Sequence, residues 1–205
     1  MIAIIDYGLG NIRAFANIFK NLGFATTIAR SRTDLASARR IILPGVGAFD
    51  HAMERFEASG MRETVEDLVL AHNRPVLGVC VGMQILAEAS EEGQRHGLGW
   101  IAGTVRKIRF EATDAAHILP HMGWNTVRVN SPSPLFSGLG GASEFYFLHS
   151  YYFQCADQAS SIATADYATS FTCAVNARNI FGVQFHPEKS HGNGIQLLKN
   201  FAELE

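Results

Sequence analysis

Short apolar runs alternate with longer periodic stretches along the chain up to Gly97. The short runs predict strands, and the stretches with an apolar residue every three or four positions predict helices, because side chains repeat differently along the two structures. The predicted strands span residues 2–5, 26–29, 41–43 and 76–79. Gly or Pro marks the junctions, so the pattern favours a largely parallel sheet with helices on both faces.

Four helices are predicted within this series. The first has an apolar stripe of Ile12, Phe15, Phe19 and Leu22. Gly23 can end that helix, and Thr33 can cap a second, short one. The third carries its apolar face on Phe49, Ala52, Met53 and Phe56. The fourth follows the strand at 76–79, and its core-facing residues are Ile85, Leu86 and Ala89.

After Gly97 the pattern changes to strand-like runs separated by turn residues, which favours antiparallel pairing. These predicted strands span residues 105–110, 126–129, 145–148, 161–165, 171–175 and 180–185. A last helix is predicted from the spacing of Ile195, Leu198, Phe201 and Ala202. No linker or repeat divides the chain, so we expect one α/β domain over residues 1–205 with a mixed, mostly parallel sheet.

Composition narrows the class of protein. The 205 residues are 47% hydrophobic and 18% charged, which is enough apolar material for one sizeable core. A formal net charge of −2 gives no basic field that would hold a nucleic acid or an anionic membrane. The first residues lack the pattern of a secretory signal, and no run of about 18 apolar residues follows, so we expect a cytoplasmic protein without a membrane span.

The three cysteines, Cys80, Cys155 and Cys173, are odd in number and widely spaced. This argues against a disulfide framework and against a zinc cluster, and we expect no metal and no other cofactor. Cys155 and Cys173 lie in apolar, strand-like surroundings, where a free cysteine is usually a buried structural residue. Cys80 differs from them because glycines frame it.

The segment Gly78-Val79-Cys80-Val81-Gly82 has the spacing of a nucleophile elbow, with Cys in the place of the nucleophile. A strand that turns directly into a helix forces one residue into a strained backbone conformation, and only small neighbours allow the close approach. Backbone N–H groups at the start of the helix favour a thiolate. We therefore interpret Cys80 as a nucleophile.

A thiolate nucleophile needs a base and a group that orients the base. His186 follows the predicted strand at 180–185, and Glu188 comes two residues later. Pro187 between them restricts the backbone, so that both side chains can point the same way. We expect His186 to share the proton of Cys80 and Glu188 to hold the imidazole.

A glycine-rich loop, Gly45, Val46 and Gly47, follows the third predicted strand and lies at the same sheet edge as Cys80. Its backbone N–H groups and that of Val81 are candidate donors to an oxyanion. Without the other two motifs, we would interpret this loop as an ordinary turn between a strand and a helix.

In their order along the chain, the motifs PGVGAF, GVCVGMQIL and GVQFHPEKS resemble those of the class I glutamine amidotransferases. Gln84, four residues after the cysteine, and the His-Pro-Glu block are hallmarks of that family, and the resemblance runs the whole length of the chain. Three further blocks are DYGLGN from Asp6, PHMGWN from Pro120 and YFLHSY from Tyr146. They look like blocks of the glutaminase subunits of imidazole glycerol phosphate synthases.

The resemblance implies that Cys80 attacks the side-chain amide of glutamine, that a thioester forms, and that ammonia and then glutamate leave. This agrees with the chemistry inferred from the residues, since an amide is a poor electrophile that needs nucleophile, base and oxyanion donors together. The residues that the resemblance assigns to the substrate glutamine are Gly47, Gln84, His149, Ser150 and Tyr151.

The ammonia needs an acceptor, and because the glutaminase motifs occupy the chain, we expect the acceptor on another chain. The resemblance implies a (β/α)₈-barrel cyclase that forms a heterodimer with this chain and makes imidazole glycerol phosphate and aminoimidazole carboxamide ribonucleotide in histidine biosynthesis. Asn11, Trp124 and Lys189 occupy positions that face this partner in the family. From the residues alone, Trp124 could equally be a core aromatic, and Lys189 a solvated charge.

Three alternatives remain open from the sequence. A paralogous glutaminase could supply ammonia to an amidotransferase that modifies a nucleotide-linked surface sugar, and residues 110–119 are not distinctive enough to decide. A cysteine peptidase or deglycase could share the elbow, although it would lack Gln84 and the His-Pro-Glu placement. A non-catalytic subunit could keep the fold, although Cys80, His186 and Glu188 are all present.

Overall fold

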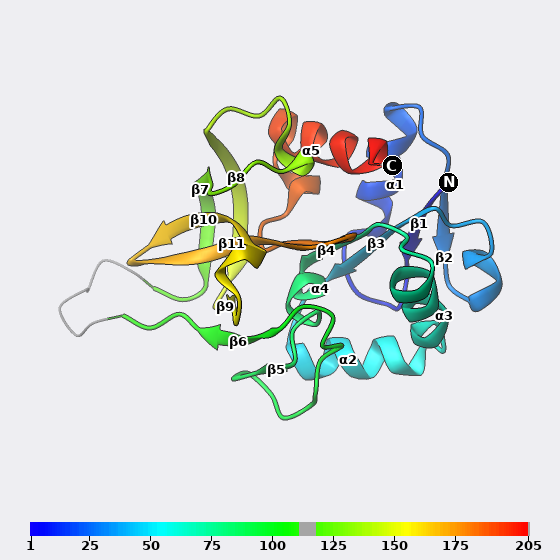
Figure 1. Cartoon of the computed structure of the whole chain (residues 1–205), viewed down its shortest axis with the longest axis horizontal. Coiled ribbons are helices and arrows are strands. Elements are labelled where there is room, and N and C mark those ends of the chain that lie inside the picture. Colours follow the sequence, from blue (N-terminus) through cyan, green and yellow to red (C-terminus); the bar gives the residue numbers. More distant parts are fainter. Residues whose placement is uncertain (111–117, 205) are drawn as a thin grey trace.

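A computed structural model describes residues 1–110 and 118–204. Five parallel strands form one half of its main sheet, and they are β1 (Ile2–Ile5), β2 (Thr26–Ala29), β3 (Arg40–Gly45), β4 (Val76–Cys80) and β12 (Ile180–Val183). They lie in the order β2-β1-β3-β4-β12, and Figure 1 labels the first four of them. The carboxyl ends of parallel strands meet at one edge of a sheet, which is where open α/β sheets form their sites.

Four antiparallel strands extend the sheet beyond β12, and they are β7 (His121–Val129), β8 (Ala142–His149), β10 (Ser161–Tyr167) and β11 (Thr169–Ala177). Their order is β12-β11-β10-β7-β8. The mixed sheet is thus confirmed, although among the described residues parallel pairings make up half of it rather than most. A second sheet, in the order β5-β6-β9, contains β5 (Ala89–Ser90), β6 (Gly103–Lys107) and β9 (Tyr151–Cys155).

Helices cover both faces of the parallel half of the sheet (Figure 1). α1 (Ile12–Asn21) and α5 (His191–Glu203) lie on one side, and α2 (Phe49–Ala58) and α3 (Arg62–Glu66) lie on the other. The alternation of strands and helices expected up to Gly97 is confirmed up to β4. In the described part of the chain, no helix has both the length and the apolar character needed to cross a membrane.

The fourth predicted helix is much shorter than expected. α4 spans only Val81–Gln84, and Ala89 belongs to β5. The physical reason is that the backbone after α4 pairs with a later loop, where the Leu98 N–H donates to the Ile85 carbonyl at 2.8 Å. Ile85 is nevertheless fully buried, as expected.

Two expectations about single residues are wrong. The short helix after β2 is a 3₁₀ turn, Arg32–Leu35, that begins after Ser31 and not at Thr33, because the Asp34 carboxylate accepts the Ser31 N–H at 2.9 Å. Ile195 is 41% exposed. The buried stripe of α5 starts one position earlier and runs through Gly194, Leu197, Leu198 and Phe201.

Strand ends also differ from the sequence prediction. β12 ends at Val183 rather than at 185, and β6 ends at Lys107 rather than at 110. The pairing of β6 with β9 stops where Lys107 meets Tyr151, the first residue of β9, a strand that the sequence did not predict. Of the stretch 110–119, residues 111–117 lie outside the described residues.

Candidate active site

Cys80 stands at the sharp turn between β4 and α4. Its backbone has φ 55° and ψ −114°, which residues with a Cβ rarely adopt. Glycines allow the turn, since a Cβ on Gly78 would lie 2.5 Å from the Gly82 carbonyl oxygen, and a Cβ on Gly82 only 1.9 Å from that of Leu43. The expected elbow geometry is therefore confirmed. Cys80 is 4% exposed, so its thiol faces a pocket rather than open solvent.

His186 and Glu188 lie on the turn after β12, which forms a 3₁₀ helix at Pro187–Lys189. His186 Nδ1 is 2.9 Å from Glu188 Oε1, and both side chains are almost fully buried. Ser190 holds the turn, because its hydroxyl donates to the His186 carbonyl at 2.6 Å. With Nδ1 engaged by the carboxylate, Nε2 is the ring nitrogen left for Cys80.

Competing effects set the charge of His186. Burial disfavours the imidazolium and lowers the pKa, but hydrogen bonds with Cys80 and Glu188, together with attraction to their negative charges, raise the pKa of His186 to about 10. The ring therefore carries a proton at neutral pH. An imidazolium can stabilise negative charge on a neighbouring sulfur, so the arrangement suits nucleophilic attack by Cys80.

Glu188 has a second neighbour in Asn11, whose side-chain Nδ2 donates to the same Oε1 atom at 3.4 Å. The other carboxylate oxygen, Oε2, is buried and has no hydrogen-bond partner among the described residues. Asn11 is exposed at the start of α1, so it connects the molecular surface with the carboxylate that orients His186.

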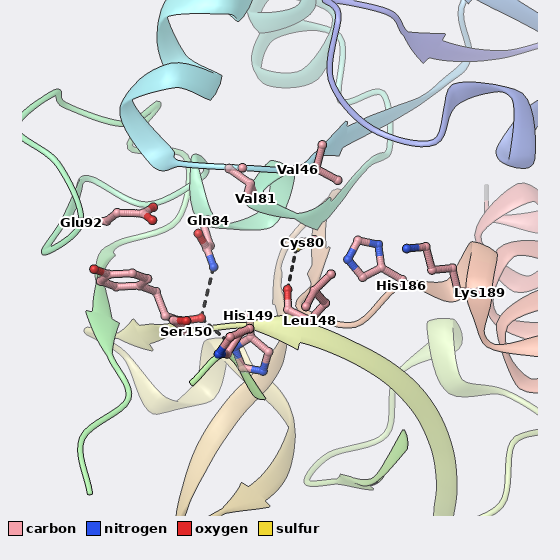
Figure 2. Close-up of a pocket in the computed structure, with 13 residues that line it drawn as sticks. Val46, Cys80, Val81, Gln84, Glu92, Leu148, His149, Ser150, His186 and Lys189 are labelled. Atoms are coloured by element: carbon pink, nitrogen blue, oxygen red, sulfur yellow. Dashed lines mark hydrogen bonds between the residues drawn. The ribbon is translucent and has the colours of Figure 1, made fainter. Parts of the chain in front are cut away.

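A pocket of about 300 Å³ opens beside Cys80 (Figure 2). The candidate residues that line it are Val46, Gly47, Cys80, Val81, Gln84, His149, Ser150, Tyr151, His186 and Lys189. The candidate residues that do not line it are Asn11, Gly45, Trp124 and Glu188. The pocket has the size of a site for a small metabolite.

The glycine-rich loop after β3 forms one wall of the pocket. Gly45 is the last residue of β3 and pairs with Cys80, and a Cβ on it would lie 2.5 Å from the Gly82 nitrogen. Gly45 therefore packs behind the elbow, and Val46 and Gly47 are the residues of this loop that reach the pocket. Gly47 has φ +94°, which a glycine adopts without strain.

The side chain of Gln84 is buried, and its Nε2 donates to the Tyr151 carbonyl at 3.2 Å and to Gln184 Oε1 at 3.0 Å. The Tyr151 carbonyl also accepts a hydrogen bond from His149 Nδ1 at 2.8 Å. Burial lowers the pKa of His149 to about 3, so the ring is neutral and its Nε2 can accept from His121 Nδ1 at 3.0 Å. This network fixes the orientation of Gln84 and His149 on one side of the pocket.

Sequence reasoning did not single out five residues at the site, which are Glu92, Pro120, His121, Leu148 and Gln184. Four of them fall within the motif blocks, but no pattern in the sequence distinguishes them from their neighbours. Glu92 has no sequence signal at all. Its carboxylate accepts the Phe49 N–H at 2.8 Å, where α2 begins, and it lines the pocket on that side.

Apolar side chains are exposed near the mouth of the pocket. Met122 of β7 is 65% exposed and pairs across the sheet with Leu148, which lines the pocket. Trp124 is 46% exposed and stacks on the His191 ring at a centroid distance of 5.2 Å, so the alternative of a core aromatic is wrong. Lys189 is exposed at the same mouth. A contact of these residues with a partner stays a prediction.

Comparisons with known proteins show the family to which the chain belongs, and this family agrees with the geometry of the site. The sequence profile of the family "Glutamine amidotransferase class-I" matches residues 3–204, and the chain belongs to that family. A crystal structure of a glutamine amidotransferase shares the fold, with a TM-score of 0.75, 17% sequence identity and coverage of 99% of both chains. The single-chain α/β glutamine amidotransferase fold expected from the sequence is thus confirmed.

Relatives with higher sequence identity indicate which group within this family the chain belongs to. The imidazole glycerol phosphate synthase subunit HisH of Bdellovibrio bacteriovorus is 55% identical over 204 residues, which is 100% of both chains. The subunit of the same name from Leptospira interrogans is 52% identical over 204 residues, again 100% of both. Within the class I family, the chain therefore belongs with the HisH subunits of imidazole glycerol phosphate synthase.

Proposed function

We propose that this protein hydrolyses glutamine to glutamate and ammonia, and supplies the ammonia to a partner chain that makes imidazole glycerol phosphate in histidine biosynthesis. The observation that carries the proposal is the series of contacts from Cys80 through His186 to Glu188 beside a pocket of about 300 Å³. The names of the relatives, each a subunit of that synthase, support the pathway.

In the first half of the reaction, the Cys80 thiolate attacks the side-chain amide carbon of glutamine, and negative charge moves to the oxygen. Backbone N–H groups at Gly47 and Val81 are the candidate donors to this oxyanion. The His186 imidazolium then gives its Nε2 proton to the amide nitrogen, the C–N bond breaks, and ammonia leaves. A γ-glutamyl thioester remains on Cys80, while Glu188 keeps His186 oriented.

In the second half, His186 is neutral and accepts a proton from water as the water oxygen attacks the thioester carbon. The C–S bond breaks, glutamate leaves, and the Cys80 thiolate returns to its place beside the imidazolium. Gln84, His149, Ser150 and Tyr151 line the pocket, which supports the proposal that they hold the glutamine during both steps.

We infer that the acceptor of the ammonia is a (β/α)₈-barrel cyclase that binds as a heterodimer across the mouth of the pocket. Trp124, Lys189 and Asn11 are the proposed contacts, and the exposed Met122 adds apolar surface beside the pocket. The three cysteines are all free thiols, which supports a reducing, cytoplasmic setting. We infer that residues 1–205 form one glutaminase domain.

The test is glutamate release from glutamine by the chain alone and after mixing with a barrel cyclase and its ribonucleotide substrate, with Cys80→Ala as the blank. We expect a large rise in the mixture only. No rise, with Cys80 still reactive toward alkylation, would contradict the choice of partner and favour an acceptor that modifies a nucleotide-linked sugar. Peptide cleavage without glutamine hydrolysis would contradict the glutaminase itself.

A further inference from the structure

Gln184 is a buried side chain at the site that the mechanism above does not use. It comes directly after β12 and has no exposed surface. Its carbonyl Oε1 accepts from Gln84 Nε2 at 3.0 Å, and its amide Nε2 donates to Cys80 Sγ at 3.7 Å. One side chain thus connects a residue assigned to the substrate with the nucleophile.

The neighbours of Gln184 determine which end of its amide faces the cysteine. The backbone carbonyl of Tyr151 can only accept, so Gln84 must turn its NH₂ group toward it. The same NH₂ group faces Gln184, which must therefore present its oxygen. The NH₂ group of Gln184 is then left to point at Cys80 Sγ.

The Tyr151 carbonyl, from which this ordering starts, is itself held from a second direction. His149 donates to it from Nδ1, and the His149 Nε2 accepts from His121 Nδ1 at 3.0 Å. His121 Nε2 in turn lies 3.3 Å from the amide nitrogen of Asn125, which also donates to the Asp166 carbonyl at 2.8 Å. Backbone carbonyls at both ends fix every donor and acceptor between them.

A donor aimed at Sγ matters because Cys80 is 4% exposed and water has little access to its charge. Sγ also lies 3.9 Å from the Leu148 carbonyl oxygen, which can accept the S–H of the thiol but repels a thiolate (Figure 2). The Gln184 N–H offsets that repulsion. Hydrogen bonds to charged groups are about twice as strong as those between neutral groups, so this contact strengthens when the sulfur is ionised.

We propose that Gln184 is a further catalytic residue of this site, whose amide stabilises the Cys80 thiolate and sets the orientation of Gln84. The inference rests on the proposed glutaminase function for its biological meaning. Its physical content concerns the thiol alone, and so it can be measured without glutamine.

The test is the pH dependence of the rate at which iodoacetamide alkylates Cys80 in the full chain, with the modified residue identified by mass spectrometry. Gln184→Met keeps the approximate size of the side chain and removes the donor. We expect its pH–rate profile to be displaced by about one unit to higher pH, so that alkylation is about tenfold slower than in the wild type at any pH on the rising part of the profile. The Michaelis constant for glutamine should also rise, because Gln84 loses an orienting partner.

Asn200→Leu is the matched control. Asn200 is a buried amide on α5 that binds the carbonyls of Leu135 and Ser137 and has no contact with the site, so its loss destabilises the fold without removing a donor to sulfur. Its alkylation profile should overlay that of the wild-type protein. Should Gln184→Met fail to fold, Gln184→Asn gives the same test, because its amide is retracted by one methylene from Sγ.

A Gln184→Met profile that overlays those of the wild type and of Asn200→Leu would overturn the proposal and make Gln184 a packing residue. A displaced Gln184→Met profile, together with a wild-type protein that hydrolyses no glutamine even with its partner, would support the thiolate contact and contradict the proposed function instead. The two claims therefore fail separately.

Discussion

Cys80 combines a reactive side chain with a backbone conformation that its own Cβ disfavours. At φ 55° and ψ −114° a residue other than glycine costs of the order of 1–3 kcal/mol. Pairing of β3 and β4 and the tight packing of Gly82 hold the residue there. This backbone conformation points the sulfur toward His186, and the pairing and packing around the turn offset its energetic cost.

This strain predicts an unusual order of stability for two variants that both lack the thiol. Cys80→Gly should have a free energy of unfolding about 1 kcal/mol higher than that of Cys80→Ala, because glycine adopts the turn without strain, although its unfolded chain is more flexible. Urea unfolding of the two variants measures the difference. Equal values would mean that the elbow stores no backbone strain.

The ion pair of His186 and Glu188 predicts the effect of Glu188→Gln. The variant loses the charge that holds the imidazolium, so the pKa of His186 should fall from about 10. We expect glutamine hydrolysis at neutral pH to fall roughly 10²- to 10⁴-fold. Steady-state kinetics with the partner present measures this, and a variant within twofold of the wild type would contradict the role of Glu188.

The same shift links stability to pH. The pKa of His186 is raised in the folded chain above its ordinary value of 6.5, so the contribution of the ion pair is complete below pH 6.5 and is lost as the pH rises through about 10. The excess stability of the wild type over Glu188→Gln should therefore shrink between these two pH values. An excess that stays constant over that range would show that the ion pair does not titrate as described.

At the scale of elements, the site depends on how closely β3 approaches the turn of β4 into α4. A Cβ on Gly82 would lie 1.9 Å from the Leu43 carbonyl oxygen, which is backbone and cannot move aside. Gly82→Ala should therefore lower the free energy of unfolding by about 3 kcal/mol or more. Gly192→Ala in α5 is the control, since it meets open space and should stabilise by about 0.5 kcal/mol. Thermal or urea unfolding compares the two, and equal effects would remove the packing argument.

Periodicity was sufficient for elements whose partners are adjacent in the sequence. β1 to β4, α1 and α2 appear close to the predicted bounds, because each buries one regular face. The short α4 and strand β9 were not predictable in this way. Residues after Gln84 leave the helix because they pair with the loop around Leu98, and Tyr151–Cys155 becomes a strand because it pairs with β6. Such distant pairings leave no periodic signal.

The candidate site divides in the same manner. Cys80, His186 and Glu188 were found because their spacing within short motifs reflects a local turn. Gln184 and His121 could not be placed at the site from the sequence, because their side chains bond with residues 100 and 28 positions away. Only folding brings Gln184 next to Gln84 and His121 next to His149.

For the whole molecule, the exposed apolar surface at the mouth of the pocket predicts where the partner binds. Trp124→Ala should weaken association about tenfold or more, since half-exposed Trp residues are frequent anchors of interfaces, while stability changes by less than about 1 kcal/mol. Leu70→Ala is the control, because Leu70 is 53% exposed, lies in the helical turn Asp67–Ala71 after α3 and does not line the pocket. Titration calorimetry with the cyclase and thermal unfolding measure the two effects. Unchanged affinity with markedly lower stability would place Trp124 among packing residues.

The central claim is that Cys80 produces ammonia here for synthesis on another chain, and one measurement tests it most directly. Synthesis of imidazole glycerol phosphate by the reconstituted pair is followed with glutamine, and then with ammonium salts, as the nitrogen source. We predict that Cys80→Ala abolishes synthesis from glutamine and leaves synthesis from ammonium intact. Equal loss of both activities, or glutamine-dependent synthesis that survives the substitution, would contradict this division of labour.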